Sequence, residues 1–277
     1  MRAREIIMKI IFLLCACVSI IAVAAICLFM FMNGFPAIKE IGVLGTEWRP
    51  GQNLFGIFPM IVGSIYVTAG AIIFGVPVGI LTAVFMAHYC PKKLYSVLKP
   101  AIGLLAGIPS IVYGFFGLVV IVPAMQKIFS TSGKGILTAS LLLGIMILPT
   151  IIEVTESSLR AVTTSYYEGS LALGATKERT IFKSVMVAAK SGVMSGVILG
   201  IGRAIGETMA VIMVAGNQAA IPTSVLSGVR TLTANIVLEM AYAADLHRDA
   251  LIATAVVLFV FILIINVCFS LVKRRNG

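Results

Sequence analysis

Residues 10–32 read IIFLLCACVSIIAVAAICLFMFM, an unbroken apolar run that follows a short basic start. A transmembrane helix needs about 20 mostly apolar residues, whereas the apolar core of a signal peptide is about 7–15 residues long. The run therefore predicts a retained first membrane helix rather than a cleaved leader. Cys27 is followed by more apolar residues instead of a soluble chain, so we expect no lipoprotein cleavage site either.

The rest of the chain has the same character. Of its 277 residues 60% are hydrophobic and only 12% are charged, whereas soluble domains carry about 25% charged residues. Too few polar residues remain to cover a water-exposed surface, so we expect no soluble domain. The apolar segments predict six membrane-crossing helices, at about 9–32, 58–87, 100–126, 135–152, 186–216 and 249–272.

The basic residues predict the orientation. If both termini are cytoplasmic, 14 of the 21 lysines and arginines lie on the inside and six lie in outside loops, as the positive-inside rule requires. The net charge of +10 therefore indicates membrane orientation rather than nucleic-acid binding. We expect a multi-pass protein of the cytoplasmic (inner) membrane, divided into residues 1–57, with the first helix and an external loop, and residues 58–277, which contain a cytoplasmic loop at 153–185.

Chemistry-bearing motifs are scarce in the sequence. The cysteines and histidines show no metal-ligand spacing, and no nucleophile and base cluster outside the apolar segments. A phosphate-binding P-loop is also missing, because the one Gly-Lys pair, Gly133-Lys134, is followed by Gly135 rather than Ser or Thr. We therefore expect no catalytic residue, no metal site and no cofactor bound by this chain.

Residues 153–185 predict two short amphipathic helices. Ser165 and Glu168 have the spacing of a capping box, which predicts a helix from residue 166. Gly174 interrupts the pattern, and Thr176 is placed to cap a second helix from Lys177. Such a compact pair can dock in a cleft of another protein, or it can simply link two membrane helices.

The stretch Gly202-Arg203-Ala204-Ile205-Gly206-Glu207-Thr208-Met209-Ala210 places two charges inside the fifth apolar segment. An Arg at bilayer depth costs about 2.5–3.5 kcal/mol, so Arg203 needs a protein or water environment. Glu207, four residues later, is expected on the same helix face. Either the two side chains pair and lock helices together, or Arg203 supplies its planar donors to an anion while Glu207 orients it.

The third apolar segment contains Ala106-Gly107-Ile108-Pro109-Ser110-Ile111-Val112-Tyr113-Gly114. Pro109 predicts a kink or a full helix break. A break would start a half-helix at Pro109-Ser110, with free N–H groups that favour an anion. Tyr113 is either a packed aromatic with one hydrogen bond or a contact on the route.

Two sets of residues carry a resemblance to a known family. Glu168 and Gly174 fall in register with the "EAA" loop of ABC-importer permeases, although Gly169-Ser170 replaces Ala-Ala and residues 184–187 lack the terminal proline. Residues 105–114 and 203–208 resemble segments of the phosphate-specific transport (Pst) permeases. Residues 209–217, 145–150, 231–236, 48–50 and 55–57 resemble the PstC-type subunit.

This resemblance implies an all-α, six-helix permease of the ABC importer (MetI-like) type with both termini inside. It implies coupling to an ATPase through Glu168, Gly169, Leu173, Gly174 and Ala175, and a substrate pathway that includes Arg203, Glu207, Thr208, Ser110 and Tyr113. The implied partners are a PstA-like permease subunit, a PstB-like ATPase dimer that binds ATP–Mg, a PstS-like external phosphate-binding protein, inorganic phosphate and membrane lipid, with no nucleic acid.

Alternatives remain open from the residues alone. An ABC permease for sulfate, molybdate or another oxyanion would share the cytoplasmic loop. A secondary anion transporter would be expected to show paired inverted repeats, and the sequence shows none. A membrane sensor would need a soluble output domain, and no stretch of the sequence is polar and long enough to form one.

Overall fold

The computed structural model describes residues 2–40, 42 and 44–276, with side chains for residues 4–38, 42, 44–268 and 270–271. The elements are α1 (Arg2–Glu40), β1 (Trp48–Arg49), η1 (Pro50–Gln52), β2 (Leu54–Phe55), α2 (Phe58–Val84), η2 (Phe85–Tyr89), α3 (Lys92–Gly107), α4 (Ser110–Phe116), η3 (Gly117–Ile121), α5 (Val122–Phe129), α6 (Ile136–Arg160), α7 (Thr164–Ala172), α8 (Lys177–Thr180), η4 (Ile181–Val185), α9 (Met186–Ala188), α10 (Lys190–Gly206), α11 (Met209–Val214), α12 (Leu232–Glu239) and α13 (Asp245–Asn276).

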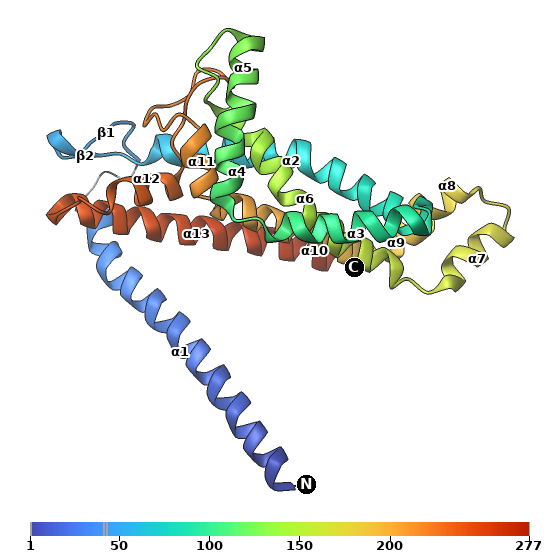
Figure 1. Ribbon diagram of the computed structural model, residues 1–277. Coiled ribbons are helices and arrows are strands. Elements are labelled where there is room, and N and C mark those ends of the chain that lie inside the picture. The colour runs from blue at the N-terminus through green and yellow to red at the C-terminus, as the bar shows by residue number, and fades with distance from the viewer. Residues whose placement is uncertain (1, 41, 43, 277) are drawn as a thin grey trace.

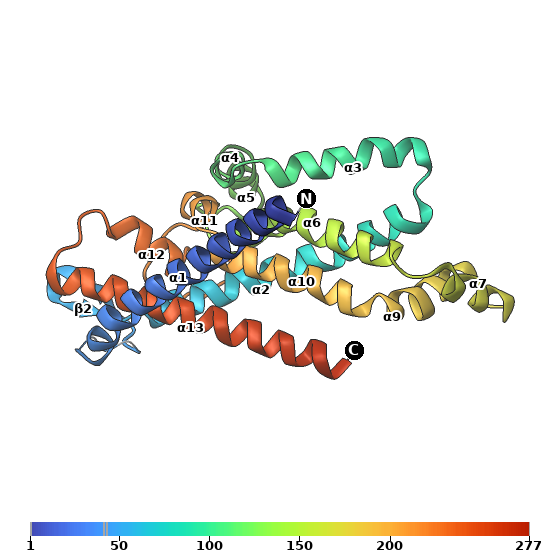
Figure 2. The same cartoon turned by 90° about the horizontal axis from the view of Figure 1, so that it is seen from below.

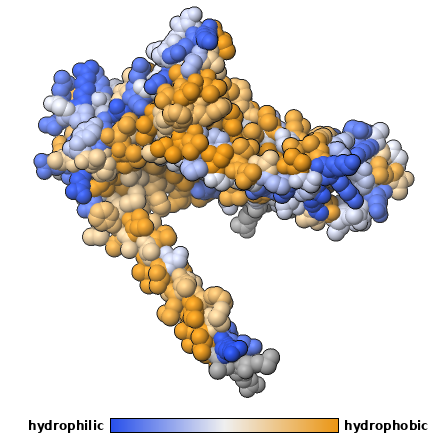
Figure 3. All heavy atoms as spheres, viewed as in Figure 1, coloured by the Kyte–Doolittle hydropathy of each residue, from blue (hydrophilic) through white to orange (hydrophobic). Residues whose placement is uncertain are grey.

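The body of the molecule is elongated, and α2, α6, α10 and α13 run along its length (Figures 1 and 2). The β1–β2 hairpin and α12 lie at one end, here called the hairpin end, and α7 and α8 lie at the other, here called the loop end. Figure 3 shows polar residues gathered at both ends and apolar residues between them. This distribution fits a body that crosses a bilayer with its apolar middle in the hydrocarbon region, where exposed polar groups are costly.

The centre of the body is the contact between α2 and α6. Ile147 and Ile151 of α6 are fully buried there. Gly75 and Gly79 of α2 face them, and a Cβ atom added to Gly75 would lie only 2.7 Å from the Ile147 side chain. Small residues let helices approach closely inside a membrane, where packing replaces the hydrophobic effect as the source of stability.

Helix α1 stands apart from the body over most of its length (Figure 1). It meets α13 near its C-terminal end, where the rings of Phe31 and Phe259 lie 5.8 Å apart and Gly34 approaches Val256. Its apolar stretch over Arg4–Ile38 is otherwise unburied within this single chain. The predicted first membrane helix is therefore present, and its surface is left for lipid or another protein.

The predicted membrane helices are confirmed in number but not in shape. Within the described residues, five helices are long and apolar enough to cross a membrane, or six if the pair 177–188 and 190–206, bent by 74°, counts as one span. The predicted third segment is divided between α3 and α4–α5, and the fifth between α9, α10 and α11. The two-stranded hairpin, pairing Trp48 with Phe55, was not predicted.

The predicted orientation and domain division remain predictions. The charge count depends in part on Arg2, Lys39 and residues 273–275, whose side chains lie outside the described set. Residues 153–160 of the predicted cytoplasmic loop belong to α6, which continues to Arg160.

Candidate functional site

Two helices break inside the body, each within a segment that the sequence singles out. Helix α3 ends at Gly107, Ile108 is extended, and α4 begins at Ser110 directly after Pro109. Helix α10 ends at Gly206, and Glu207 is extended before α11 begins at Met209. Pro109 explains the first break because it has no N–H and restricts the residue before it. The sequence predicted a kink or a full break at Pro109, and the structure has a full break.

The short helices that follow the two breaks pack on each other. A Cβ atom added to Gly114 of α4 would lie 2.9 Å from the Cα of Ala210 and 2.8 Å from the sulfur of Met213, both in α11. Both helices turn away from the long axis of the body, side by side in Figures 1 and 2. The fold therefore brings the two quoted motifs, about 100 residues apart in sequence, into direct contact.

Arg203 lies in the last turn of α10, beside the second break. Its side chain is half-buried and donates a hydrogen bond to the hydroxyl of Thr150 at 3.3 Å. Tyr113 of α4 is buried, and its hydroxyl donates to the carbonyl oxygen of Leu105 at 2.9 Å. Of the two interpretations of Tyr113, the packed aromatic with one hydrogen bond is the one that the geometry supports.

Glu207 does not pair with Arg203 among the ion pairs of the described residues, so the structure does not support the interpretation in which the two side chains pair and lock helices together. The i,i+4 relationship requires one continuous helix, and α10 ends one residue before Glu207. The carboxylate instead accepts the backbone N–H groups of Thr208 and Ala210, at 3.0 and 3.2 Å. Glu207 thereby satisfies donors that the break leaves free at the start of α11.

Two further hydrogen bonds are made to the backbone at the second break. The hydroxyl of Thr208 donates to the carbonyl oxygen of Gly206 at 3.2 Å, and that of Thr233 in α12 donates to the carbonyl oxygen of Glu207 at 3.1 Å. Ser110, the first residue of α4, is half-buried. All five predicted pathway residues thus belong to the two breaks or to the helices that flank them.

At the loop end, residues 161–180 form a protruding knob made of α7, Gly174 and α8 (Figures 1 and 2). Gly174 has φ +84°, a left-handed conformation that glycine adopts without strain. Thr176 caps α8 by accepting the N–H of Arg179, as predicted. The predicted capping box is wrong, since α7 begins at Thr164 and Ser165 lies within its first turn.

The predicted coupling residues lie at the outer surface of this knob. The side chain of Leu173 is 91% exposed, Glu168 and Gly169 are exposed, and Ala175 is half-buried. Leu173 therefore presents its apolar side chain outward, away from the rest of this chain. The hydroxyls of Ser170 and Thr180 lie 3.0 Å apart and hold the two short helices together.

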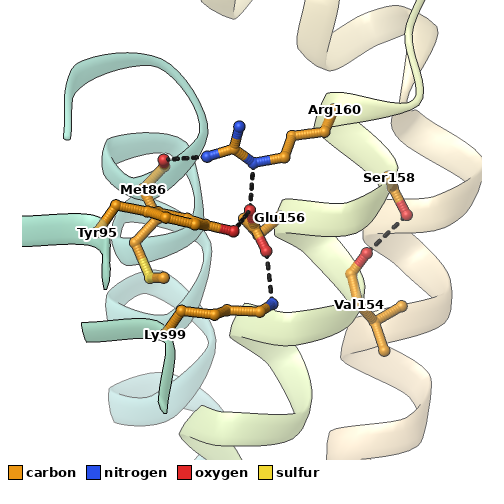
Figure 4. Close-up of polar contacts among 7 residues, drawn as sticks. All are labelled: Met86, Tyr95, Lys99, Val154, Glu156, Ser158 and Arg160. Atoms are coloured by element: carbon orange, nitrogen blue, oxygen red, sulfur yellow. Dashed lines mark hydrogen bonds and ion pairs between the residues drawn. The ribbon is translucent and has the colours of Figure 1, made fainter. Parts of the chain in front are cut away.

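Sequence reasoning missed Glu156, which it placed in the loop. Glu156 lies in the last turns of α6, and its side chain is 2% exposed. Its carboxylate accepts hydrogen bonds from Tyr95 at 2.9 Å, from Lys99 at 2.7 Å and from Arg160 (Figure 4). Burial opposes the charge on Lys99, but the hydrogen bond and charge of Glu156 outweigh it and raise the pKa of Lys99.

Arg160 extends this cluster to η2, which continues α2. It donates to the carbonyl oxygen of Met86 at 2.9 Å and lies 4.5 Å from the centre of the Tyr95 ring. Met86 belongs to the π-helical turn η2, where the wider i→i+5 bonding pattern frees a carbonyl group. Glu156 and Arg160 have the i,i+4 spacing that a sequence can show, but nothing local indicated that Lys99, 57 residues away, joins them.

A second buried glutamate was also missed, at the hairpin end. Glu239 of α12 accepts hydrogen bonds from Trp48 at 2.9 Å and from Arg230 at 2.5 Å, and lies 2.8 Å from His247. Arg230 further donates to Asn235 at 3.0 Å. Glu239 therefore ties the hairpin and the start of α13 to α12, whose Thr233 contacts the second break.

Comparison with known proteins agrees with this architecture. Residues 75–276 match the family described as "Binding-protein-dependent transport system inner membrane component". The chain is 38% identical over 268 residues to a probable ABC transporter permease protein, YqgH, of Bacillus subtilis, covering 91% of this chain and 86% of the relative. It is 32% identical over 274 residues to the phosphate transport system permease protein PstC of Mesorhizobium japonicum, covering 90% and 84%.

Solved structures show the same fold. An inward-facing MetNI methionine ABC transporter chain superposes with a TM-score of 0.63 at 20% identity, covering 83% of this chain and all of that one. A chain of a bacterial ABC transporter for alginate import gives a TM-score of 0.60 at 13% identity, covering 93% and 95%. With a helical body crossed by two broken helices, a protruding two-helix knob and a family match over most of its length, this chain belongs to the binding-protein-dependent transport system inner membrane components, the membrane-embedded permease subunits of ABC importers.

Proposed function

We propose that this chain is the PstC-type permease subunit of an ATP-driven importer of inorganic phosphate. The observation that carries the proposal is Arg203, a guanidinium in the last turn of the apolar helix α10, beside the second helix break, where it donates to the hydroxyl of Thr150. An arginine within an apolar membrane helix is costly unless it has a function or a partner. Its planar fork matches the oxygens of a phosphate ion.

The surrounding groups suit an anion route. Glu207 is held by the backbone N–H groups at the start of α11, so its charge has a fixed position at the second break. In this proposal Glu207 accepts a hydrogen bond from a protonated phosphate oxygen and disfavours a fully deprotonated anion. Thr208 and Ser110 supply hydroxyl groups at the starts of the two short helices, and Tyr113 fixes the geometry of the first break.

The partners follow from the family and from the shape of the chain. The family works with an external binding protein and an ATPase. We assign the ATPase contact to the knob, through Glu168, Gly169, Leu173, Gly174 and Ala175, with ATP–Mg bound by a PstB-like dimer. A PstA-like subunit would form the other half of the pathway, and a PstS-like protein would deliver phosphate at the hairpin end. The loop end then faces the cytoplasm and the chain lies in the cytoplasmic membrane.

The proposal supports a direct test in liposomes that contain the purified complex with its ATPase, second permease subunit and binding protein. Labelled phosphate should accumulate inside the liposomes only when ATP is enclosed on the side that the loop end faces and the binding protein is added on the side that the hairpin end faces. Excess unlabelled phosphate should abolish uptake, and excess sulfate or molybdate should not. Stronger competition by sulfate or molybdate than by phosphate would instead favour a permease for that other oxyanion.

A further inference from the structure

Helix α3 is an arm that touches the body at few points. Among its described side chains, Ile102 is the buried one, packed with Met86 and Ile152. Leu94, Val97 and Leu104 are exposed. The orientation of α3 relative to α6 therefore depends on the packing of Ile102 and the partly buried Leu98, and on the hydrogen bonds that Tyr95 and Lys99 make to Glu156 (Figure 4).

In the proposed importer, α3 connects the first helix break with the Glu156 cluster. Its C-terminal end is the first helix break, and Tyr113 beyond the break bonds back to Leu105 in its last turn. A rotation of α3 must therefore move the start of α4. Because α4 packs on α11 through Gly114, the second break is affected as well.

The other side of the Glu156 cluster leads to the knob. Glu156 and Arg160 form the last turns of α6, and α7 begins only four residues after Arg160. The knob also rests on η2, where the rings of His88 and Tyr167 stack with centroids 6.2 Å apart and Lys177 lies 4.5 Å from the Tyr89 ring centre. Arg160 holds η2 through the carbonyl oxygen of Met86. Glu156 thus lies where the knob, η2 and α3 converge.

We propose that Glu156 is a positioning residue that passes movement of the knob to the helix break at Ile108–Pro109, by holding α3 to the last turns of α6. The inference rests on the proposed function, because it assumes that the knob is where an ATPase acts. Glu156 touches neither the break nor the knob's outer surface. Its contribution is the rigid connection between them, made by a buried carboxylate with three donors from two helices.

Glu156→Gln keeps the shape of the side chain but removes its charge, and Glu153→Gln is the matched control. Glu153 lies three residues earlier in α6 and interacts with Lys99 through its charge alone among the described contacts. In liposomes containing the full complex, phosphate uptake and ATP hydrolysis are measured in parallel. We expect Glu156→Gln to lower the phosphate imported per ATP hydrolysed by about fivefold or more, while ATP hydrolysis changes far less. Glu153→Gln should leave the ratio unchanged.

An unchanged ratio in Glu156→Gln would overturn the proposal. If this variant does not assemble, Lys99→Met is used instead, since it leaves Arg160 and Tyr95 on Glu156 but removes one tie to the arm. A normal ratio of uptake to hydrolysis in an assembled Lys99→Met complex would equally overturn the proposal. The double variant Lys99→Met, Glu156→Gln should lower the ratio of uptake to hydrolysis no further than Glu156→Gln alone, because both substitutions act on the same connection between α3 and α6.

A second readout separates this inference from the phosphate assignment. In a variant whose five cysteines are replaced by alanine, Ile108→Cys reports the first break through its labelling rate with a water-soluble maleimide. Nucleotide binding by the ATPase should change that rate, and Glu156→Gln should remove the change. If wild-type complexes import no phosphate but show the nucleotide response, and Glu156→Gln abolishes that response, then phosphate is rejected as the substrate and the positioning role of Glu156 is supported. A full nucleotide response in Glu156→Gln rejects the role whatever the substrate.

Discussion

The hydroxyl of Tyr113 and the carbonyl oxygen of Leu105 lie 2.9 Å apart, on opposite sides of the break at Ile108–Pro109. This hydrogen bond replaces a connection that the broken helix no longer makes through its backbone. Tyr113→Phe keeps the buried ring and removes only this bond, at a cost of about 1 kcal/mol. We expect a lower maximal rate of phosphate uptake with an unchanged half-saturating concentration. A change in that concentration alone would indicate direct contact with the substrate.

Arg203 should require a guanidinium and not merely a positive charge. Arg203→Lys keeps the charge but loses the planar fork, and Arg203→Gln loses both. We expect uptake to fall strongly in both variants while the complex still assembles, as judged by co-purification of the ATPase. Loss of assembly in Arg203→Gln would show instead that the side chain holds helices together through Thr150.

Glu207→Gln should alter selectivity without collapsing the second break. The amide oxygen of glutamine can still accept the N–H groups of Thr208 and Ala210, so the start of α11 is kept while the charge is lost. We expect sulfate to compete better with phosphate in uptake, because the carboxylate no longer disfavours a fully deprotonated anion. Competition by sulfate that stays as weak as in the wild type would refute this role. Glu207→Ala, which also loses the acceptor, should in addition reduce stability.

Two glycines of the knob make a matched pair. A Cβ atom meets nothing within 4 Å at Gly169 or at Gly174, but Gly174 alone has a left-handed backbone. Gly174→Ala should cost about 1 kcal/mol through backbone strain and misplace Leu173. Gly169→Ala, inside α7, should be neutral or slightly stabilising. Although Gly169 is assigned to the same contact, alanine is the residue that the EAA pattern carries at this position, so affinity of the permease for the ATPase should fall in Gly174→Ala and not in Gly169→Ala. Equal losses would mean that side-chain bulk at the docking surface is the cause.

The buried cluster at the hairpin end should contribute strongly to stability. Arg230→Met leaves the carboxylate of Glu239, which is 8% exposed, without its arginine. Breaking a buried pair from one side costs about 3–5 kcal/mol. Arg49→Met is the control, since Arg49 and Glu47 form an exposed pair at 3.6 Å, worth at most about 1 kcal/mol. Thermal unfolding in detergent should separate the two variants clearly, and similar unfolding temperatures would show that the Glu239 cluster is not a main source of stability.

Local sequence signals predicted the features that depend on neighbouring residues. The apolar runs gave the membrane class and the number of spans, since bilayer thickness sets the length of each run. Pro109 marked the first break, and Gly174 and Thr176 marked the turn and cap within the knob, because each acts on the backbone beside it. Motif resemblance then pointed to the family, which the match over residues 75–276 confirms.

Only the tertiary structure decided which partners the charged side chains have. Four-residue spacing suggested an ion pair between Arg203 and Glu207, yet the backbone turns between them and sends each to a different partner. Lys99 and Glu156 are 57 residues apart, and no local pattern indicates that they meet. In an apolar membrane interior a charge must find a partner wherever the packing of distant helices provides one, so its environment follows from the whole fold and not from the residues next to it.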